Sequence, residues 1–513
     1  MEVNLTTSAT PHLGKERAAV AWRALLGLAL AAAALHIATN GAYGFHRDEL
    51  QVLDDARHLT WGLVAYPPFT PAIERLGLDL FGLSLRWLRL WSVLAQALVL
   101  LFSGMITAEL GGSNFAQITA ALAVAASGLP MFSATEFQYT SFDLLWMTAL
   151  VYCLARILRR GNERWWIAAG LFGGLGLETK YSMVFYLGAL ALALALTPAR
   201  RNFRSRWLWY GLGLAFAIAL PNIVWQAQHG WISFYFLRYI HARDLAIGRT
   251  RGYWPQQFTI NSPLFAAPLT VAGAIWFFLP AQRRFRPLGL IFALIVVGLW
   301  LAKARGYYAA AVYPMVLAAG AVWWESALRR LPKFWPFAAQ AATVAVMVFN
   351  AVMMALFILP LGPVSSSNYA LRHNGNLREE VGWNELAAET ARIWRALPAA
   401  ERAHAAILTF NYGETGAIDL LGRRYGLPPA ISPVNSAWYR GYGSTPPQTE
   451  IILGLSARQV NASFGGCRLA GHNGNRYGIH NEESDAHPDI FICGPLRQPW
   501  APAWREAQMK SFG

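Results

Sequence analysis

The sequence predicts an all-α protein that crosses a membrane many times and carries a small α/β domain at its C-terminal end. Three observations lead to this fold class. The chain of 513 residues is 55% hydrophobic and only 14% charged, whereas a soluble domain carries roughly 25% charged residues. Several apolar runs exceed the ~18 residues that a bilayer-spanning helix needs. After residue 360, polar residues, glycine and proline become more frequent and no run is long enough to span.

Apolar runs of ~17–25 residues predict about eleven membrane-spanning helices. Their ranges are 20–40, 88–109, 115–133, 141–158, 165–177, 181–197, 207–227, 263–280, 287–302, 307–325 and 337–360. Because ten further runs follow the first, we interpret it as a retained anchor rather than a cleaved signal peptide. Residues 1–360 are therefore assigned to a transmembrane domain, with 41–87 as its first outer loop, and 361–513 to an extracytoplasmic domain.

Basic residues gather in alternate connections between the predicted spans, which sets the orientation. The clusters are Lys15, Arg17 and Arg23; Arg159, Arg160 and Arg164; Arg200, Arg201, Arg204 and Arg206; Arg283, Arg284 and Arg286; and Arg329, Arg330 and Lys333. Short loops rich in Lys and Arg stay in the cytoplasm, so the N-terminus is expected there and the C-terminal domain outside. Since the net charge of +15 is scattered between apolar runs, nucleic acid is not an expected partner.

The C-terminal domain has the patterns of short strands alternating with helices. We predict strands at Ala405–Phe410, Glu450–Leu455 and Asp489–Cys493, and helices at 383–397, 414–425 and 456–464. Cys467 and Cys493 both lie in this domain, where an oxidising compartment would allow a disulfide; two free buried thiols are the open alternative. The cysteine and histidine spacings match no standard zinc site.

The first outer loop carries the most informative carboxylates, Asp48 and Glu49, directly after the first predicted span. Residues 48–60 and 70–81 are predicted as short helices on the membrane surface. A sugar attached to a polyprenyl phosphate presents its anomeric carbon at this level, where a carboxylate can deprotonate an attacking hydroxyl. Helical neighbours point about 100° apart, so the two do not form a glycosidase pair. We assign the base to Asp48 and a supporting role to Glu49, orienting Arg47 or the next loop; the alternative is that Asp48 caps the helix.

Positive charges on the outer side are the second informative feature. Arg243, Lys303, Arg305 and Lys180 lie at outer span ends or in outer loops, where the positive-inside tendency disfavours them. An anionic ligand such as a phosphate accounts for the group. An ion pair of Lys180 with Glu178 and snorkelling of Lys303 and Arg305 to lipid head groups stay open as alternatives.

Two further features have either a functional or a structural interpretation. Asp143 begins the fourth predicted span from the outside, where it either faces the same cavity or stabilises the start of its helix. The segment Asn411-Tyr-Gly-Glu-Thr-Gly follows a predicted strand and opens a helix. It is either an anion or glycan site or a plain turn.

Four segments resemble a known family. They are Phe45-His-Arg-Asp-Glu-Leu with Tyr66-Pro-Pro-Phe, Gly174-Leu-Gly-Leu-Glu-Thr-Lys-Tyr-Ser, Pro221-Asn-Ile-Val-Trp-Gln-Ala-Gln-His-Gly-Trp, and Lys303-Ala-Arg-Gly-Tyr-Tyr-Ala-Ala-Ala-Val-Tyr-Pro. In this order they resemble the bacterial relatives of the dolichyl-phosphate-mannose protein mannosyltransferases, which include the lipid A aminoarabinose transferase and belong to the GT-C membrane glycosyltransferases. The resemblance covers residues 20–325, with fewer spans than several relatives and no acceptor domain of the eukaryotic type.

The resemblance implies a GT-C-like helical bundle that transfers a sugar, with inversion, from a polyprenyl-phosphate donor. The acceptor would be a glycan, lipid or protein outside the cytoplasm, reached from the bacterial inner membrane and its lipids. The family's first-loop Asp matches Asp48, with Glu49 completing the pair. The residues expected at the donor phosphate are Lys180, Lys303, Arg305, Arg243 and Arg47, and those expected around the substrate cavity are His46, Tyr66, Pro67, Pro68, Asp143, Tyr307 and Tyr308. Metal use differs among GT-C enzymes, so a divalent metal is left open and no other cofactor is expected.

Two other classes of protein are alternatives to a glycosyltransferase. A secondary transporter or lipid flippase would place ionisable residues and broken helices near the membrane midplane, usually in two repeated halves. A non-catalytic assembly protein would use the outer domain as a binding module. The Asp-Glu loop opposite outer cations favours the enzyme.

Overall fold

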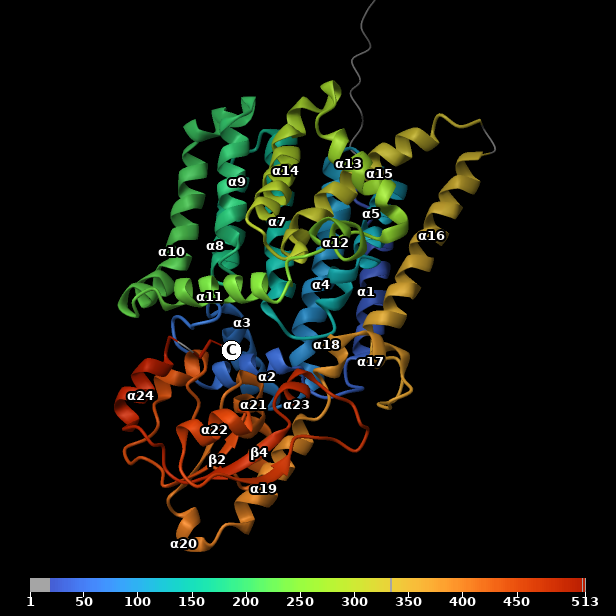
Figure 1. Cartoon of the computed structure of the whole chain (residues 1–513). Coiled ribbons are helices and arrows are strands. Elements are labelled where there is room, and N and C mark those ends of the chain that lie inside the picture. Colours follow the sequence, from blue (N-terminus) through green and yellow to red (C-terminus); the bar gives the residue numbers. More distant parts are fainter. Residues whose placement is uncertain (1–18, 333–334, 510, 513) are drawn as a thin grey trace, which may run out of the picture.

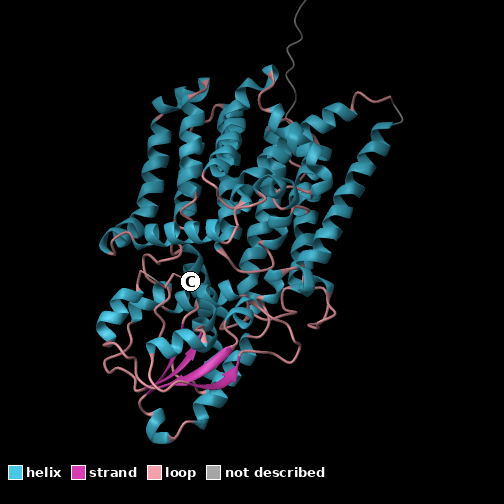
Figure 2. Ribbon diagram, in the orientation of Figure 1, coloured by secondary structure: helices cyan, strands magenta, loops and turns pink. Residues whose placement is uncertain are grey.

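The computed structural model describes residues 19–332, 335–509 and 511–512. Apolar helices form one bundle, and the C-terminal part of the chain packs against one end of it (Figure 1). Figure 2 shows that the strands are confined to this C-terminal part and the rest of the described chain is helical. The predicted fold class is confirmed.

Seven helical segments of the described chain are long and apolar enough to cross a membrane. They are α1 (Trp22–Thr39), α4 (Leu85–Glu109), α7 (Tyr139–Arg160), α10 (Arg206–Gln228), Pro280–Leu301 with α14 (Arg286–Leu301), Gly306–Leu328 with α15 (Tyr313–Leu328), and α16 (Trp335–Ile358). Two bent pairs raise this to nine if each pair is one span. The pairs are α9 (Met183–Ala195) with Pro198–Arg204, and α12 (Tyr253–Thr259) with Leu264–Trp276, which contains α13 (Ala267–Trp276).

Every predicted span corresponds to a helical segment of the structure, but the count of eleven stays a prediction. Two of the segments are shorter apolar helices, α5 (Asn114–Ala125) and α8 (Trp165–Leu177). The helix α6 (Gly128–Phe132) follows α5 within the same predicted range. Length and composition therefore support between seven and nine spans.

Glycines allow the closest approaches between helices of the bundle. A Cβ atom at Gly170 of α8 would lie 2.0 Å from the carbonyl oxygen of Gly211 in α10. A Cβ at Gly273 of α13 would lie 2.0 Å from the carbonyl oxygen of Val316 in α15. Small residues at such crossings are typical of membrane helices, which associate through close packing rather than through the hydrophobic effect.

The connections that carry the clustered arginines lie at the end of the bundle opposite the sheet. The α9–α10 turn, the α13–α14 turn and the C-terminal end of α15 are all at that end in Figure 1. The α7–α8 turn belongs to the same end, since Arg284 donates to the carbonyl oxygen of Arg159. Of the predicted basic clusters, Lys15, Arg17 and Lys333 lie outside the described residues.

Short helices fill the space between the bundle and the C-terminal part. α2 (Arg47–Arg57) and α3 (Phe69–Phe81) form where the sequence predicts them. α11 (Ile232–Ala246) runs across the ends of the spanning helices in Figure 1. These helices form the boundary layer in which the predicted site residues gather.

The C-terminal part contains a four-stranded sheet in the order β1-β2-β4-β3. The strands are β1 (Ala405–Thr409), β2 (Thr449–Leu453), β3 (Arg468–His472) and β4 (Asp489–Cys493). β1 pairs parallel with β2, and the other two pairs are antiparallel. The helices are α17 (Tyr369–His373), α18 (Gly375–Arg378), α19 (Trp383–Ala396), α20 (Ala399–Arg402), α21 (Tyr412–Gly416), α22 (Ala457–Ser463), α23 (Glu482–Ala486) and α24 (Trp500–Ala507).

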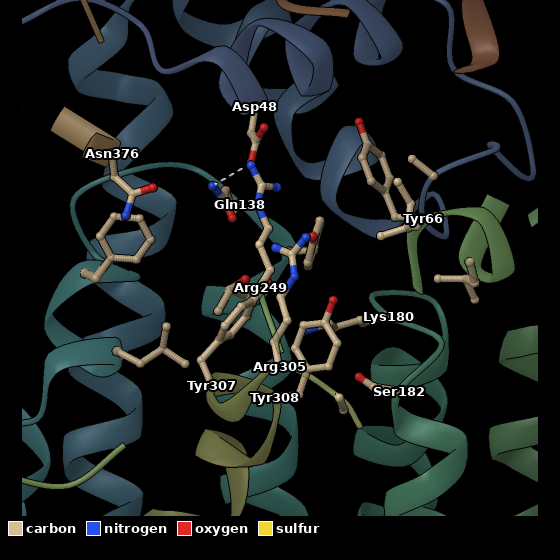
Figure 3. Close-up of a pocket in the computed structure, with 18 of the residues that line it drawn as sticks. Asp48, Tyr66, Gln138, Lys180, Ser182, Arg249, Arg305, Tyr307, Tyr308 and Asn376 are labelled. Carbon is tan, nitrogen blue, oxygen red and sulfur yellow. Dashed lines mark hydrogen bonds between the residues drawn. The ribbon is translucent and has the colours of Figure 1, made fainter. Parts of the chain in front are cut away.

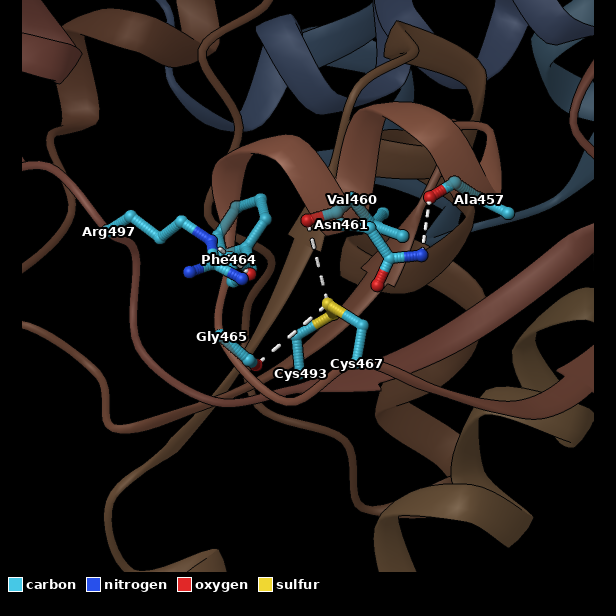
Figure 4. Close-up of a disulfide and its surroundings, with 8 residues drawn as sticks. All are labelled: Ala457, Val460, Asn461, Phe464, Gly465, Cys467, Cys493 and Arg497. Atoms are coloured by element: carbon cyan, nitrogen blue, oxygen red, sulfur yellow. Dashed lines mark hydrogen bonds between the residues drawn. A yellow bond between two sulfur atoms is a disulfide. The ribbon is translucent and has the colours of Figure 1, made fainter.

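Cys467 and Cys493 are joined by a disulfide, shown in Figure 4. It connects the residue before β3 to the last residue of β4. The third cysteine, Cys153, is a buried free thiol in α7. β3 was not predicted, because this edge strand has mostly exposed or half-buried side chains without a buried alternation.

Candidate functional site

A cavity of about 2070 Å³ lies where the bundle meets the C-terminal part. Its walls come from α2, α9, α11, α14 and the loops around Gln138 and Arg305, and its lid from residues of the C-terminal part such as Tyr412 and Glu482. Figure 3 shows the polar section, with Asp48 and Gln138 above Lys180 and the two tyrosines at 307 and 308. Most of the residues proposed from the sequence are in this section.

Asp48 lies in the first turn of α2, and its carboxylate is not used to cap the helix. His46 is the N-cap: its Nδ1 accepts from the Asp48 backbone N–H at 3.1 Å, while Glu49 accepts from the His46 N–H at 2.8 Å. The capping alternative for Asp48 is therefore wrong. Its side chain is 32% exposed and lines the cavity, so it is available to a bound molecule.

Both oxygens of the Asp48 carboxylate accept hydrogen bonds. Tyr412 Oη donates to Oδ1 at 2.9 Å, and Gln138 Nε2 donates to Oδ2 at 3.1 Å. Each oxygen has two lone pairs, so acceptor capacity remains. Hydrogen bonds to an ionised carboxylate stabilise the charged form.

The pKa of Asp48 lies below its usual value. Burial alone would raise this pKa, but His46, Arg47, the Tyr412 hydrogen bond and Arg305 outweigh it. Burial also lowers the pKa of His46 to about 4, so that imidazole is neutral at pH 7. The charges that keep Asp48 ionised at neutral pH are therefore those of Arg47 and Arg305.

Glu49, the residue after Asp48, does not line the cavity. Its carboxylate is completely buried and forms two hydrogen bonds with Arg89 of α4, at 2.8 and 2.9 Å. It also accepts from the Phe137 backbone N–H at 2.8 Å. Of the two roles expected for Glu49, it does not pair with Arg47, but it does hold the next outer loop, which precedes α7. Its place is structural and not at the reacting atoms.

Glu136 and Gln138 form a chain of polar groups from His46 to Asp48. Gln138 Nε2 also donates to Glu136 Oε1 at 2.6 Å, and Glu136 Oε2 lies 3.2 Å from His46 Nδ1. Burial, together with the charges of Asp48, Glu49 and Glu380, raises the pKa of Glu136 well above its usual value. Glu136 therefore holds its proton more tightly than Asp48 does.

Four of the five cations expected at a phosphate line the cavity, namely Arg47, Lys180, Arg243 and Arg305. Lys180 Nζ lies 3.4 Å from Asp143 rather than on Glu178, and 5.0–5.8 Å from the rings of Tyr139, Tyr307 and Tyr308. Arg305 is held by both oxygens of Asp244. Arg47 bonds Glu482 at 2.7 Å.

Lys303 is not in the cavity, and its expected place there is wrong. It occupies the tight turn after α14 with a positive φ of 50°, and its side chain is exposed. Two residues later the chain turns Arg305 inward. The turn therefore separates two cations that look equivalent in the sequence.

The expected cavity residues divide into two groups. His46, Tyr66, Pro67, Tyr307 and Tyr308 line the cavity. Pro68 does not; it is the buried N-cap residue of α3. Asp143 lines only a small adjoining space, beside Lys180 and the tyrosines at 307 and 308.

An apolar arm continues the cavity between α9, α11 and α14. Its lining residues are Val184, Phe185, Ala189, Leu192, Phe234, Leu237, Leu294, Ile295 and Leu299. Lys180 precedes α9 and Arg305 follows α14, so both cations lie next to ends of helices that supply these apolar residues. The cavity can therefore hold an apolar chain next to an anionic group.

Comparisons with known proteins agree with this arrangement. A family model described as dolichyl-phosphate-mannose-protein mannosyltransferase matches residues 65–225. The lipid A galacturonosyltransferase RgtD from Rhizobium johnstonii is 30% identical over 244 residues, which are 46% of this chain and 48% of that protein. The chain thus matches about half the length of this curated relative.

Solved structures supply the decisive likeness. ArnT from Cupriavidus metallidurans bound to undecaprenyl phosphate superposes with a TM-score of 0.56 at 14% identity, covering 93% of this chain and 98% of ArnT. The arabinofuranosyltransferase AftD from Mycobacteria superposes with a TM-score of 0.54 at 14% identity, covering 94% of this chain and 40% of AftD. The chain has the GT-C fold. The resemblance seen in the sequence is confirmed.

Several cavity residues were not expected from the sequence. They are Gln138, Tyr139, Asn376, Tyr412 and Glu482. Tyr412 belongs to the Asn411-Tyr-Gly-Glu-Thr-Gly segment, whose two glycines were a signal that could have identified it. Among the residues that the structure describes, no group of three or more His, Cys, Asp or Glu is placed to hold a metal ion.

Proposed function

We propose that this protein is a membrane glycosyltransferase that moves a sugar from a polyprenyl-phosphate donor to a hydroxyl group outside the cytoplasm. The observation that carries the proposal is the position of Asp48, an ionised carboxylate at the head of a cavity that continues as an apolar arm. The relatives named above are themselves glycosyltransferases, and ArnT is solved with undecaprenyl phosphate.

The proposed donor lies with its polyprenyl chain in the apolar arm and its phosphate near Lys180 and Arg305. Both cations already hold a carboxylate partner, Asp143 and Asp244. A phosphate joining them would form charge-assisted hydrogen bonds, which are roughly twice as strong as neutral ones. The three tyrosine rings around Lys180 fix its direction.

In the proposed reaction the acceptor hydroxyl attacks the anomeric carbon of the donor sugar. Asp48 takes the hydroxyl proton as the new carbon–oxygen bond forms. The bond from the anomeric carbon to the phosphate oxygen breaks, and polyprenyl phosphate departs with the electron pair. Arg305 and Lys180 stabilise the charge on this leaving group. A single displacement inverts the anomeric centre.

The orientation and domain division follow from the charge pattern and belong to the same proposal. The arginine-rich turns face the cytoplasm of a bacterial inner membrane. The segment after residue 360 is then an extracytoplasmic domain covering the site. The acceptor is a lipid or glycan at that surface, consistent with the lipid A substrate in the name of RgtD.

A transporter or lipid flippase is not favoured. Such proteins place substrate-binding ionisable groups near the membrane midplane. The polar residues that line the cavity include Asp48 of α2 and Tyr412 and Glu482 of the C-terminal part, and these elements lie at one end of the bundle rather than at its middle (Figure 1).

The test measures release of undecaprenyl phosphate, which does not require the acceptor to be known. Membranes with wild-type protein are incubated with a panel of undecaprenyl-phosphate sugars carrying a hexose, a pentose or a uronic acid, and released lipid is quantified by mass spectrometry. We expect Asp48→Asn to lower release by roughly 100-fold or more, the usual range for a general base.

Asp79→Asn is the matched control, because Asp79 is an exposed carboxylate of α3 in the same outer loop, paired with Arg75. It should keep wild-type release. Near-normal release by Asp48→Asn, or a wild type that consumes no donor of the panel, contradicts the proposal.

A further inference from the structure

The segment Asn411-Tyr-Gly-Glu-Thr-Gly is a docking motif for α2. A Cβ atom at Gly413 would lie 2.6 Å from Arg47 Cγ, and one at Gly416 would lie 2.5 Å from the carbonyl oxygen of Leu50. The two glycines therefore face α2 one turn apart, and α21 approaches α2 more closely than any larger residue would allow. This explains a motif for which the sequence alone allows either a binding site or a plain turn.

The close approach delivers the side chain of Tyr412 to Asp48. The Tyr412 hydroxyl donates to Asp48 Oδ1 at 2.9 Å, and its ring lies 5.3 Å from the Arg47 guanidinium carbon. Asn411 fixes the start of α21, since it accepts from the Gly413 N–H and donates to Glu483, both at 2.6 Å. The Tyr412 side chain therefore contacts Asp48 through its hydroxyl and Arg47 through its ring.

The far end of α2 is tied to the same part of the chain. Arg440 bonds Asp54 of α2 and lies 3.1 Å from Asp419. Asp55, the next residue of α2, accepts from the Tyr66 hydroxyl at 2.6 Å, and Tyr66 lines the cavity. Contacts at both ends of α2 therefore set the relative position of Tyr412 and Asp48.

We propose that Tyr412 is a positioning residue for Asp48, and that the C-terminal part of the chain thereby completes the catalytic centre. The inference rests on the proposed glycosyl transfer. The phenol occupies one lone pair of Oδ1 and restrains rotation of the carboxylate, so that the remaining lone pairs face the acceptor hydroxyl. It also stabilises the ionised carboxylate that accepts the proton.

Tyr412 is suited to donate a hydrogen bond to Asp48, because its phenol does not ionise near neutral pH. Burial and the neighbouring Asp48 raise the pKa of the Tyr412 phenol well above its usual value. Tyr412 therefore keeps its proton and acts only by donating a hydrogen bond. Asp48 remains the group that receives the proton of the acceptor.

The experiment compares Tyr412→Phe with wild type in full-length protein, using the undecaprenyl phosphate release assay across pH. Phe keeps the ring over Arg47 and removes only the hydroxyl. We expect turnover at neutral pH to fall roughly 10-fold, as for a lost hydrogen bond to a charged group. Because the carboxylate loses a stabilising donor, the acidic limb of the rate profile should move to higher pH. Binding of undecaprenyl phosphate should not change.

Tyr425→Phe is the matched control, since Tyr425 lies in the same part of the chain with its ring over Arg424. It should keep both the rate and the profile. A Tyr412→Phe protein with the wild-type pH profile overturns the inference while Asp48→Asn remains inactive. A Tyr412→Phe protein that aggregates or loses lipid binding also overturns it, because the role would then be structural. A wild type that releases no lipid instead contradicts the proposed function.

Discussion

Arg89 of α4 and Glu49 of α2 form a two-pronged ion pair in which neither side chain is exposed, with hydrogen-bond distances of 2.8 and 2.9 Å. Arg89 also donates to the backbone oxygens of Asn40 and Gly44 and lies 3.3 Å from Glu380. A spanning helix, the first outer loop and the C-terminal part thus meet at one guanidinium. Glu49 directly follows Asp48, the proposed base, in the sequence.

Removing the guanidinium should destabilise the protein strongly. Arg89→Met leaves Glu49 buried without its partner, and breaking a buried pair in this way costs roughly 3–5 kcal/mol. The check is the thermal unfolding midpoint of the detergent-solubilised protein. Arg86→Met is the control, because Arg86 is an exposed residue of the same helix and its loss should leave the midpoint nearly unchanged. Equal midpoints for the two variants would show that the pair does not hold α2.

The cavity cations should contribute to donor binding while their exposed neighbour does not. Arg305→Gln and Lys180→Gln each remove a positive charge from the cavity lining. A hydrogen bond to a charged group contributes roughly 1.5–3 kcal/mol, so we expect affinity for undecaprenyl phosphate to fall about 10-fold or more, measured by native mass spectrometry.

Lys303→Gln is the matched control for these variants, since it removes the same charge from an exposed position of the same turn. It should bind undecaprenyl phosphate as wild type does. Lys180→Gln also leaves Asp143 unpaired, so the double variant Lys180→Gln, Asp143→Asn separates the two effects. Restored stability with weak binding supports the phosphate role; restored binding contradicts it.

The bundle could be predicted from the sequence because its signals are local. Each apolar run is a helix, and α2 and α3 begin within one residue of their predicted starts at 48 and 70. The charges in the outer loops also singled out Asp48 and four cations that line the cavity. Hydrophobic runs and charge asymmetry act within a single segment, so no knowledge of distant contacts was needed.

The partners of these residues could not be predicted, because they come from distant parts of the chain. Tyr412 reaches Asp48 across 364 positions and Glu482 reaches Arg47 across 435. The separation of Lys303 from Arg305 depends on the left-handed backbone of one turn residue. Glu49 is buried because it pairs with Arg89, whereas Asp48 lines the cavity. The angle between neighbouring residues on a helix does not reveal this partner.

Glu136 should make the stability of the protein sensitive to alkaline pH. Its pKa is raised, mainly by burial, so the folded state holds this proton more tightly than the unfolded chain does. The stability from this proton is complete below the usual Glu pKa of about 4.3 and is lost as pH rises through the raised value. Glu136→Gln replaces the acid by a neutral side chain of the same shape.

We expect Glu136→Gln to unfold close to the wild-type temperature at about pH 4, and to become the more stable protein as the pH rises above the usual Glu pKa of about 4.3 toward pH 9. Unfolding midpoints of both proteins across this range are the measurement. Glu163→Gln is a control, as Glu163 is an exposed residue of the α7–α8 turn. A Glu136→Gln protein that is strongly destabilised at pH 6 would mean that Glu136 is ionised and that its charge is needed.

The cysteines offer a test of the proposed orientation in cells. Only a chain whose C-terminal part reaches an oxidising compartment forms and keeps the Cys467–Cys493 disulfide. With three cysteines in the sequence, denatured and unreduced protein should then react with one maleimide, at Cys153. Reduction before labelling should raise the number to three, which mass spectrometry counts directly.

Cys153→Ser provides the control for this count and should leave no reactive thiol before reduction. Three labelled thiols without reduction would place the C-terminal part in the cytoplasm and contradict the orientation.

The Cys467–Cys493 bond also closes a loop with a sequence separation of 26 residues. By chain entropy this contributes roughly 3–4 kcal/mol, so Cys467→Ser with Cys493→Ser should unfold the sheet at lower temperature. Because that sheet carries α21, the same double variant should lose turnover before it loses undecaprenyl phosphate binding on heating.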